Sequence, residues 1–196
     1  MKIAVFGSTG GNGRLILAEG IRRGHEVTAF ARQASALAGV SGLAAILEGN
    51  ATDQAKVLKA VADQEAVIMT VTASEAIARV ITGAMQSLGV RRLVATSAYG
   101  LVATKPYVLA PIVRRIFART YAGQLAADRV IQATDLDWTI LRATRLTNRP
   151  SSHSSRMSSE LYDRGPWSIA RASFSDALLD LAESRLYIGQ IVNITG

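Results

Sequence analysis

Short apolar runs alternate with segments of helical periodicity along the first two thirds of the chain, and this alternation constrains the fold more than any other feature. The expected strands are 2–6, 26–31, 44–47, 66–71, 92–96 and 138–141, and the expected helices are 12–23, 54–62, 74–88 and a longer one that follows Pro111 and runs to about Ala133. Continuously apolar strands that are separated by helices indicate a parallel sheet covered on both faces. The sequence therefore predicts an α/β fold, a doubly wound parallel sheet of the Rossmann type. Ligands of such folds bind at the carboxyl ends of the strands, near the point where strand order reverses.

The last third of the chain is less regular. The serine-rich segment 148–160, NRPSSHSSRMSSE, has little apolar periodicity and cannot bury enough surface to order itself alone. We interpret it as a mobile loop over the ligand site, with an ordinary disordered excursion as the alternative. A short strand near 167–169, a helix over 173–183 and a final strand over 191–194 are expected after it. The sequence contains neither an internal repeat nor a second domain, so residues 1–196 are expected to form one domain.

The composition fits one globular domain, because 49% of the 196 residues are hydrophobic and 19% are charged. No apolar run approaches the roughly 20 residues that cross a bilayer. The apolar part of the first ten residues is too short for a signal peptide. We therefore expect a cytoplasmic protein without membrane association. The chain has no cysteine and two histidines, so neither a disulfide framework nor a metal site is expected.

The formal net charge of +7 can attract phosphorylated ligands, DNA or anionic membranes. Most of the basic residues are arginines, which suit phosphate because the guanidinium group donates two parallel hydrogen bonds. They are scattered, with small clusters at 22–23, 91–92 and 114–119. We interpret these clusters as solvated helix faces and loop ends. No nucleic-acid motif accompanies them, so nucleic acid is not expected to be a partner.

The sequence GSTGGNG, which begins at Gly7, lies between the first expected strand and the first expected helix, as a dinucleotide-binding turn does. Gly7 permits the tight turn, Gly10 removes a side chain where the backbone approaches the pyrophosphate, and Gly13 lets helix and strand pack closely. The amides at the start of the helix, at Gly11 and Asn12, point at the phosphates, and the helix dipole favours their negative charge. A glycine-rich turn without a ligand is the alternative.

Further candidate residues follow the second and third expected strands. Arg32 ends the second strand, about twenty residues after the turn, where NAD-binding proteins carry an acid for the ribose 2′-hydroxyl. An arginine at this place suits the 2′-phosphate of NADP, and Arg14 is placed to help from the neighbouring turn. A purely structural Arg32 is the alternative. Asn50 and the adjoining Ala51 are expected at the adenine, whereas Asp53 either joins them or caps the helix that follows.

Six motifs together cover essentially the whole chain: VFGSTGGNG (5–13), FAR (30–32), GNATD (49–53), ATSAYG (95–100), DLDWTILR (135–142) and GQIVNITG (189–196). On these motifs the chain resembles the atypical short-chain dehydrogenases/reductases of the NmrA-like kind, in the branch of flavin reductases similar to biliverdin reductase B. Members of this branch reduce flavins, quinones or biliverdin, or only sense the redox state of the cofactor. The resemblance implies that NADPH is bound by Gly7, Thr9, Gly10, Gly13 and Arg32, with the strand ends near Thr72 and Ser97 beside the nicotinamide.

Two positions depart from the pattern of this branch. Flavin reductases of this type often carry a second basic residue four positions after the arginine that ends the second strand, where this chain has Ala36. The loss of one phosphate partner weakens the preference for NADP, so we expect NADP to be preferred and NAD to be possible. These reductases also carry a histidine near the substrate, at the position that matches Thr144, and its absence argues against biliverdin as the substrate.

Alcohol-oxidising members of the superfamily use a tyrosine with a lysine four residues later, because one helical turn places both on the same face. The residues four positions after the tyrosines of this chain are Ala103, Pro111, Leu125, Pro166 and Ile191. Tyr121 occupies the family position, with Leu125 in place of the lysine. A tyrosine without this lysine has a pKa of about 10 and is a poor general base at neutral pH. A secondary-alcohol dehydrogenase is therefore not expected.

These observations predict an NADPH-dependent reductase that transfers hydride to a flavin or quinone-type acceptor, because such acceptors take hydride while solvent supplies the proton. Ser97 and Tyr121 are the candidate catalytic residues. Ser97 is expected to orient the nicotinamide carboxamide or the acceptor, a strand-end hydroxyl bonded to backbone being the alternative, and Tyr121 is not expected to be an essential acid. The alternative function is a non-catalytic NAD(P)(H) redox sensor that regulates a partner protein. The absent lysine favours the sensor, and Ser97 mildly favours the enzyme.

Overall fold

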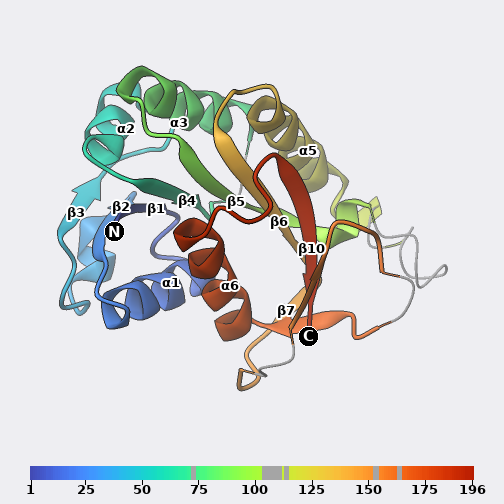
Figure 1. Cartoon of the computed structure of the whole chain (residues 1–196). Helices are drawn as coiled ribbons and strands as arrows, with labels where there is room; N and C mark the ends of the chain where they lie inside the picture. The colour runs from blue at the N-terminus through green and yellow to red at the C-terminus, as the bar shows by residue number, and fades with distance from the viewer. Residues whose placement is uncertain (72–73, 103–111, 113–114, 152–154, 163–164) are drawn as a thin grey trace.

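The structure, a computed structural model, describes residues 1–196 except 72–73, 103–111, 113–114, 152–154 and 163–164. A twisted sheet runs through the middle, with helices on both faces (Figure 1). In the described part of the chain its strands follow the order β3-β2-β1-β4-β5-β6-β10-β8. Neighbouring strands are parallel except β10 and β8. This is the doubly wound α/β arrangement that the sequence predicts.

The strands of the sheet are β1 (Lys2–Phe6), β2 (Glu26–Ala31), β3 (Ala45–Glu48), β4 (Ala66–Met69), β5 (Arg92–Ala98), β6 (Asp137–Ala143), β8 (Arg156–Ser158) and β10 (Gln190–Thr195). The helices described are α1 (Gly11–Arg22), α2 (Gln54–Val61), α3 (Glu75–Leu88), α5 (Ala118–Gln132) and α6 (Arg171–Glu183). Two short strands, β7 (Arg145–Thr147) and β9 (Ser168–Ala170), form a separate parallel pair. The short 3-10 turns η1 (Ala34–Leu37) and η2 (Tyr99–Leu101) follow β2 and β5.

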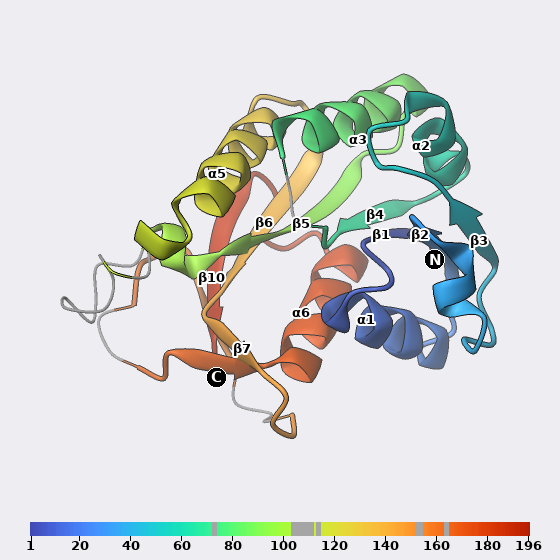
Figure 2. The same ribbon diagram turned by 180° about the vertical axis from the view of Figure 1, so that it is seen from behind.

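Two layers of helices bury the two faces of the sheet (Figures 1 and 2). α1 and α6 lie on one face, and α2, α3 and α5 lie on the other. In β1, Ile3 and Val5 face the first layer, whereas Ala4 and Phe6 face the second, and all four are fully buried. Because both faces of the strand are covered, every position after its first residue is apolar, which is the pattern that predicts a parallel sheet.

The strand order reverses between β1 and β4. The chain moves from β1 outward through β2 to β3 and then returns to the other side of β1 as β4. The segments that follow β1 and β4 therefore border the crevice in which doubly wound folds bind their ligands.

The elements differ from the expected ones mainly at their ends. α6 begins at Arg171, two residues before its expected start. The earlier start was not predicted because its N-cap residue, Ala170, has no polar side chain that would mark it. β5 extends to Ala98, two residues beyond its expected end. The single long helix expected between Pro111 and Ala133 is interrupted at Phe117, a non-helical residue with φ −99° and ψ 16° that precedes α5, so α5 begins at Ala118; residues 111 and 113–114 lie outside the described part of the chain.

The segment 148–160 contains β8, a strand that the sequence analysis did not foresee. Arg156, Met157 and Ser158 pair antiparallel with β10. Just beyond this strand, the hydroxyl of Tyr162 lies 2.6 Å from the carbonyl oxygens of Arg156 and Asn193, and the Arg156 guanidinium lies 4.6 Å from the Tyr162 ring centroid. Residues 152–154 lie outside the described residues, and the mobility of the segment stays a prediction.

Candidate functional site

The turn between β1 and α1 is closed by backbone contacts that leave no room for a side chain at Gly7 or Gly13. Gly7 has φ +88°, a conformation that residues with a Cβ rarely adopt. A Cβ on Gly7 would lie 2.8 Å from the carbonyl carbon of Thr70, so the turn touches the end of β4. A Cβ on Gly13 would overlap the carbonyl oxygen of Gly7, so α1 packs directly on the turn. Both contacts fit the tight-turn and close-packing roles predicted for these glycines.

Gly10 stands at the N-terminus of α1 in a different environment. Among the described residues, a Cβ on Gly10 would meet one atom within 4 Å, the carbonyl oxygen of Gly7 at 3.3 Å, which is a tight contact but much less severe than the overlap at Gly13. Gly10 caps α1 without a side-chain hydrogen bond, and the first turn of the helix carries no acid. Unpaired amides at a helix N-terminus bind anions. Gly11 and Asn12 stand at the start of this helix, as the phosphate-binding prediction requires.

A cavity of about 410 Å³ lies beside the turn, along the carboxyl ends of β1 to β4. Half of its lining residues were predicted to bind the cofactor; they are Gly7, Thr9, Gly10, Arg32, Asn50 and Ala51. The other lining residues are Phe30, Ala31, Gly49, Thr70, Val71 and Ile77, which the sequence analysis did not single out. Most of these additions are strand-end positions that only the sheet register brings together. Ligand cavities of this kind combine apolar walls with a few placed polar groups.

Charges of both signs lie near the end of β2. Arg32 is exposed there and lines the cavity. Nη2 of Arg14 donates a hydrogen bond to the carbonyl oxygen of Ala36 at 2.7 Å, which brings a second guanidinium group to the position where the family's second basic residue is missing. The Glu48 carboxylate accepts a hydrogen bond from the amide of Ala34 at 2.7 Å. Arg32 is thus the arginine that lines this end of the cavity, and Arg14 and Glu48 are held by backbone groups of the segment that follows it.

Asn50 and Asp53 have separate roles in the structure. Oδ1 of Asp53 accepts a hydrogen bond from the amide of Lys56 at 3.2 Å and caps α2, so the helix-cap alternative holds for this residue. Oδ1 of Asn50 accepts a hydrogen bond from the amide of Thr52 at 3.1 Å and forms a local turn. Asn50 lines the cavity, where its side-chain NH₂ group is the donor left for an adenine nitrogen.

The end of β5 is built from buried side chains. Oγ of Ser97 donates a hydrogen bond to Oδ2 of Asp128 at 2.9 Å. Nη2 of Arg142 donates to the same oxygen at 3.1 Å, and Nε2 of Gln124 donates to Oδ1 at 3.1 Å. Asp128 is fully buried, and Ser97 is 8% exposed. The proton of the Ser97 hydroxyl is therefore committed to a carboxylate, and its lone pairs are the part left for a ligand.

The sequence analysis missed Asp128 and Arg142. Each is a charged residue inside an otherwise apolar stretch: Asp128 lies beside Ala127 on the buried side of α5, and Arg142 ends the apolar run of β6. A charge on a buried face needs a partner of opposite charge. This pairing of one acid and one base in neighbouring buried elements is the signal that could have found them.

Tyr121 packs close to the segment that follows Ser97. A Cβ on Gly100 would overlap the Tyr121 hydroxyl, so the tyrosine occupies the space that this glycine leaves. Burial raises the pKa of the Tyr121 hydroxyl, which is the opposite of the change that a general base requires. Thr72, which was predicted to lie beside the nicotinamide, lies outside the described residues. Thr144 is buried, with its hydroxyl 3.2 Å from that of Thr195.

The basic clusters near the helix ends have partners within the chain. Arg23 forms ion pairs with Glu19 of α1 and with Asp180 of α6, each at 2.7 Å, and the second pair joins the two helices. The hydrogen bonds that Arg22 and Arg23 donate lower the pKa of Glu19 to about 2. Arg92 is buried and donates a hydrogen bond to the carbonyl oxygen of Asp137 at 2.7 Å. Intramolecular pairing occupies much of this charge.

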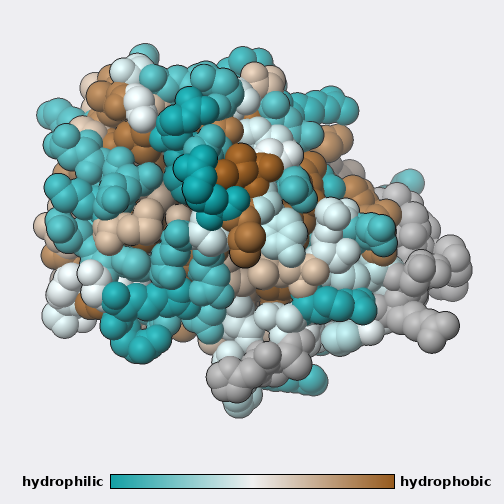
Figure 3. Space-filling model, in the orientation of Figure 1, coloured by the Kyte–Doolittle hydropathy of each residue, from teal (hydrophilic) through white to brown (hydrophobic). Residues whose placement is uncertain are grey.

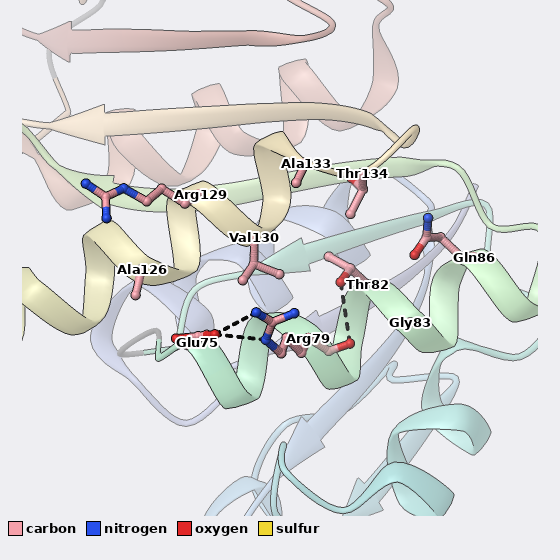
Figure 4. Close-up of a pocket in the computed structure, with 10 residues that line it drawn as sticks. All are labelled: Glu75, Arg79, Thr82, Gly83, Gln86, Ala126, Arg129, Val130, Ala133 and Thr134. Atoms are coloured by element: carbon pink, nitrogen blue, oxygen red, sulfur yellow. Dashed lines mark hydrogen bonds and ion pairs between the residues drawn. The ribbon is translucent and has the colours of Figure 1, made fainter.

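A second cavity, of about 510 Å³, lies between α3 and α5 on the outer helix layer (Figure 4). The Glu75–Arg79 ion pair of α3, at 2.7 Å, lies along one side, and Arg129 and Val130 of α5 face it from the other. None of the predicted cofactor residues that the structure describes lines this cavity. It is therefore separate from the predicted site.

The face of the molecule seen in Figure 3 is mostly hydrophilic, with hydrophobic side chains in small groups. Among the described residues, no helix combines the length and the apolar character that a membrane span requires.

A family model described as NAD(P)H-binding matches residues 7–185. Solved structures share the fold at low identity. A short-chain dehydrogenase/reductase from Veillonella parvula DSM 2008, in complex with NADP, is 20% identical over 100% of this chain and 94% of its own, with a TM-score of 0.89. ChuY, an anaerobillin reductase from Escherichia coli O157:H7, is 19% identical over 100% of this chain and 97% of its own, with a TM-score of 0.87. The oxidoreductase ylbE from Lactococcus lactis is 18% identical over 100% and 91%, with a TM-score of 0.84.

Proposed function

The chain belongs to the NAD(P)H-binding family of Rossmann domains, and on that premise we propose that it is an NADPH-dependent reductase of a flavin or quinone-type acceptor. The observation that supports the proposal is a complete dinucleotide turn together with a strand end whose two described candidate hydroxyl groups, those of Ser97 and Tyr121, are poorly suited to donate a proton. The Ser97 hydroxyl donates its hydrogen bond to Asp128, and burial raises the pKa of Tyr121. Acceptors that draw their proton from solvent suit such a site.

The reaction needs little from the protein beyond binding and alignment. The nicotinamide ring of NADPH transfers a hydride to the acceptor, solvent supplies one proton, and NADP⁺ and the two-electron-reduced flavin or quinone leave. Positioning two reactants is itself a large contribution to rate. In this scheme the Ser97 hydroxyl accepts a hydrogen bond from the nicotinamide carboxamide, because its own proton is held by Asp128.

The preference for NADPH rests on the arginines at the end of β2. Arg32 is exposed at the cavity, and Arg14 stands beside Ala36, so two guanidinium groups are available to a 2′-phosphate. The V. parvula neighbour was solved with NADP, which agrees with this choice. The reductase role agrees with the E. coli neighbour, which is named an anaerobillin reductase.

The test is a panel of flavins and quinones with the purified protein, following the absorbance of NADPH and, in parallel, of NADH. We expect oxidation of NADPH with at least one flavin or quinone, at a rate proportional to protein concentration. The Gly10→Val variant serves as the control for non-enzymatic oxidation, because it is designed not to bind the cofactor. Tight binding of NADPH with no turnover for any acceptor would replace the reductase with a redox sensor that acts on a partner protein.

A further inference from the structure

Arg171, the first residue of α6, lies against the first turn of α1. A Cβ on Gly11 would lie 3.6 Å from Cδ, 3.7 Å from Nε and 3.9 Å from Cζ of Arg171. The guanidinium group therefore lies beside the stretch of backbone whose amides are predicted to meet the cofactor phosphates. No sequence motif marked this residue, because 159 positions separate it from Asn12, which it contacts.

The partners of Arg171 are neutral. Nε donates a hydrogen bond to Oδ1 of Asn148 at 2.9 Å, and Nη1 donates to Oδ1 of Asn12 at 3.2 Å. Across the described residues, no carboxylate pairs with Arg171 and no hydrogen bond leaves its Nη2. Because both partners are neutral amides, neither of them offsets the positive charge of Arg171, and this charge can attract an anionic ligand.

The position of this charge is unfavourable without an anion. Arg171 begins α6 and lies beside the N-terminus of α1, and the first turn of neither helix contains an acid. A helix N-terminus carries a partial positive charge, and a cation placed there is repelled. Two helix N-termini and one guanidinium group thus converge on one place, and an anion bound there would relieve all three.

We propose that Arg171 is a pyrophosphate-binding residue. Its guanidinium group binds the cofactor phosphates from the side of α6, and the glycine turn binds them from the side of α1. The proposal rests on the proposed function, since it takes NADPH as the ligand. In this arrangement the Arg171 guanidinium group forms charge-assisted hydrogen bonds with the phosphates, in addition to those from backbone amides. It also links the cofactor to the start of segment 148–160, because Asn148 holds Nε of the same side chain.

The experiment compares two ligands: NADPH, and adenosine 2′-monophosphate, which keeps the adenine, its ribose and the 2′-phosphate but lacks the pyrophosphate and the nicotinamide half. We expect Arg171→Met to weaken NADPH binding about 10-fold to 100-fold, as the loss of a charge-assisted pair does, and to leave binding of adenosine 2′-monophosphate within about two-fold. Arg145→Met is the matched control. Arg145 lies nearby on β7 and is exposed, and its loss changes the net charge equally. It should leave both affinities unchanged.

Three results separate the possible failures. NADPH affinity in Arg171→Met within about two-fold of wild type would overturn the proposal and leave the cofactor assignment intact. An equal loss for both ligands would show that Arg171 only supports the fold of the turn, and would also overturn it. Failure of the wild type to bind either ligand would overturn the proposed function itself. Arg171→Lys, which keeps the charge but not the two-nitrogen fork, is the variant to use if Arg171→Met does not fold. It should bind NADPH more weakly than wild type and adenosine 2′-monophosphate equally well, and an unchanged affinity for NADPH would overturn the proposal.

Discussion

At the ends of β1, β2 and β3 the candidate site consists mainly of backbone, whereas at the end of β5 it consists of buried side chains. In the first region, the absence of Cβ atoms at Gly7 and Gly13 decides which segments touch. In the second region, one carboxylate, Asp128, holds Ser97 and Arg142 together. The first region presents unpaired amides and arginines to a ligand, and the second presents a hydroxyl group whose proton is already used.

The two regions are therefore expected to control different properties: the first controls cofactor binding, and the second controls proton donation and acceptance. Backbone amides at a helix N-terminus suit phosphate groups, so we expect the first region to bind the cofactor. A buried network has one satisfied arrangement, so the β5 end determines which groups can donate or accept a proton. A change in the first region should affect binding where it faces the ligand and stability where the backbone is packed, and a change in the second should affect stability and turnover.

The largest expected effect is in the side-chain region. Asp128→Ala removes the partner of a buried guanidinium group, and we expect the free energy of unfolding to fall by about 3 to 5 kcal/mol. Urea denaturation measures this. Asp180→Ala is the matched control, because the Asp180 side chain is 59% exposed and pairs with Arg23 at the surface, where a pair contributes about 1 kcal/mol or less. An equal loss of unfolding free energy in the two variants would show that the buried network stabilises the protein no more than a surface ion pair does.

The next effect is in the backbone region and concerns binding. Gly10 has φ −71° and ψ 166°, which valine adopts readily, and the contact of an added Cβ with Gly7 is much less severe than the overlap at Gly13. Gly10→Val should therefore cost about 1 kcal/mol of stability or less and weaken NADPH binding at least about 100-fold, because the side chain stands where the pyrophosphate approaches. Calorimetric titration and thermal melting measure the two quantities.

Gly13→Ala tests a glycine of the same turn whose expected role is packing and not ligand binding. Its Cβ would overlap the carbonyl oxygen of Gly7, so we expect about 3 kcal/mol or more of destabilisation from overpacking. For Gly10→Val, the contradicting result is an NADPH affinity equal to that of wild type, which would show that the turn does not bind the phosphates.

A smaller effect is expected for cofactor preference. Arg32→Ala should weaken binding of NADPH about 10-fold, because one charge-assisted pair to the 2′-phosphate is lost, and should leave binding of NADH nearly unchanged. Titration of both cofactors into wild type and variant gives the ratio of the dissociation constants. Equal affinity of the wild type for the two cofactors would mean that Arg32 is structural and that the protein is not selective for NADPH.

The parts of the site that could be predicted from the sequence are those set by short stretches of chain. The glycines of the turn, Arg32 and Asn50 were found because each follows a strand whose apolar pattern is visible within a few residues. Six predicted cofactor residues line one cavity for this reason. The doubly wound sheet was predicted on the same basis, since buried parallel strands are apolar over their whole length.

The parts that could not be predicted depend on contacts between distant residues. Asp128 lies 31 positions from Ser97, and Arg171 lies 159 positions from Asn12, so no local pattern joins them. β8 is another example, because a three-residue strand becomes ordered only through pairing with β10. The start of α6 at Arg171 was missed because Ala170 gives no capping signal.

The smallest expected effect tests which hydroxyl group matters at the β5 end. Tyr121→Phe should change turnover only a few-fold, since burial raises the pKa of Tyr121 and keeps it protonated throughout the neutral range. Loss of a true general acid would cost about 100-fold or more. For the same reason the pH–rate profile of the wild type between about pH 6 and 9 should show no limb that disappears in Tyr121→Phe. Ser97→Ala should cost more than Tyr121→Phe, because it removes the hydroxyl that orients the nicotinamide and leaves Oδ2 of Asp128 with one donor fewer. A hundred-fold loss in Tyr121→Phe, with Ser97→Ala close to wild type, would reverse the two roles and make a tyrosine the proton donor of the reaction.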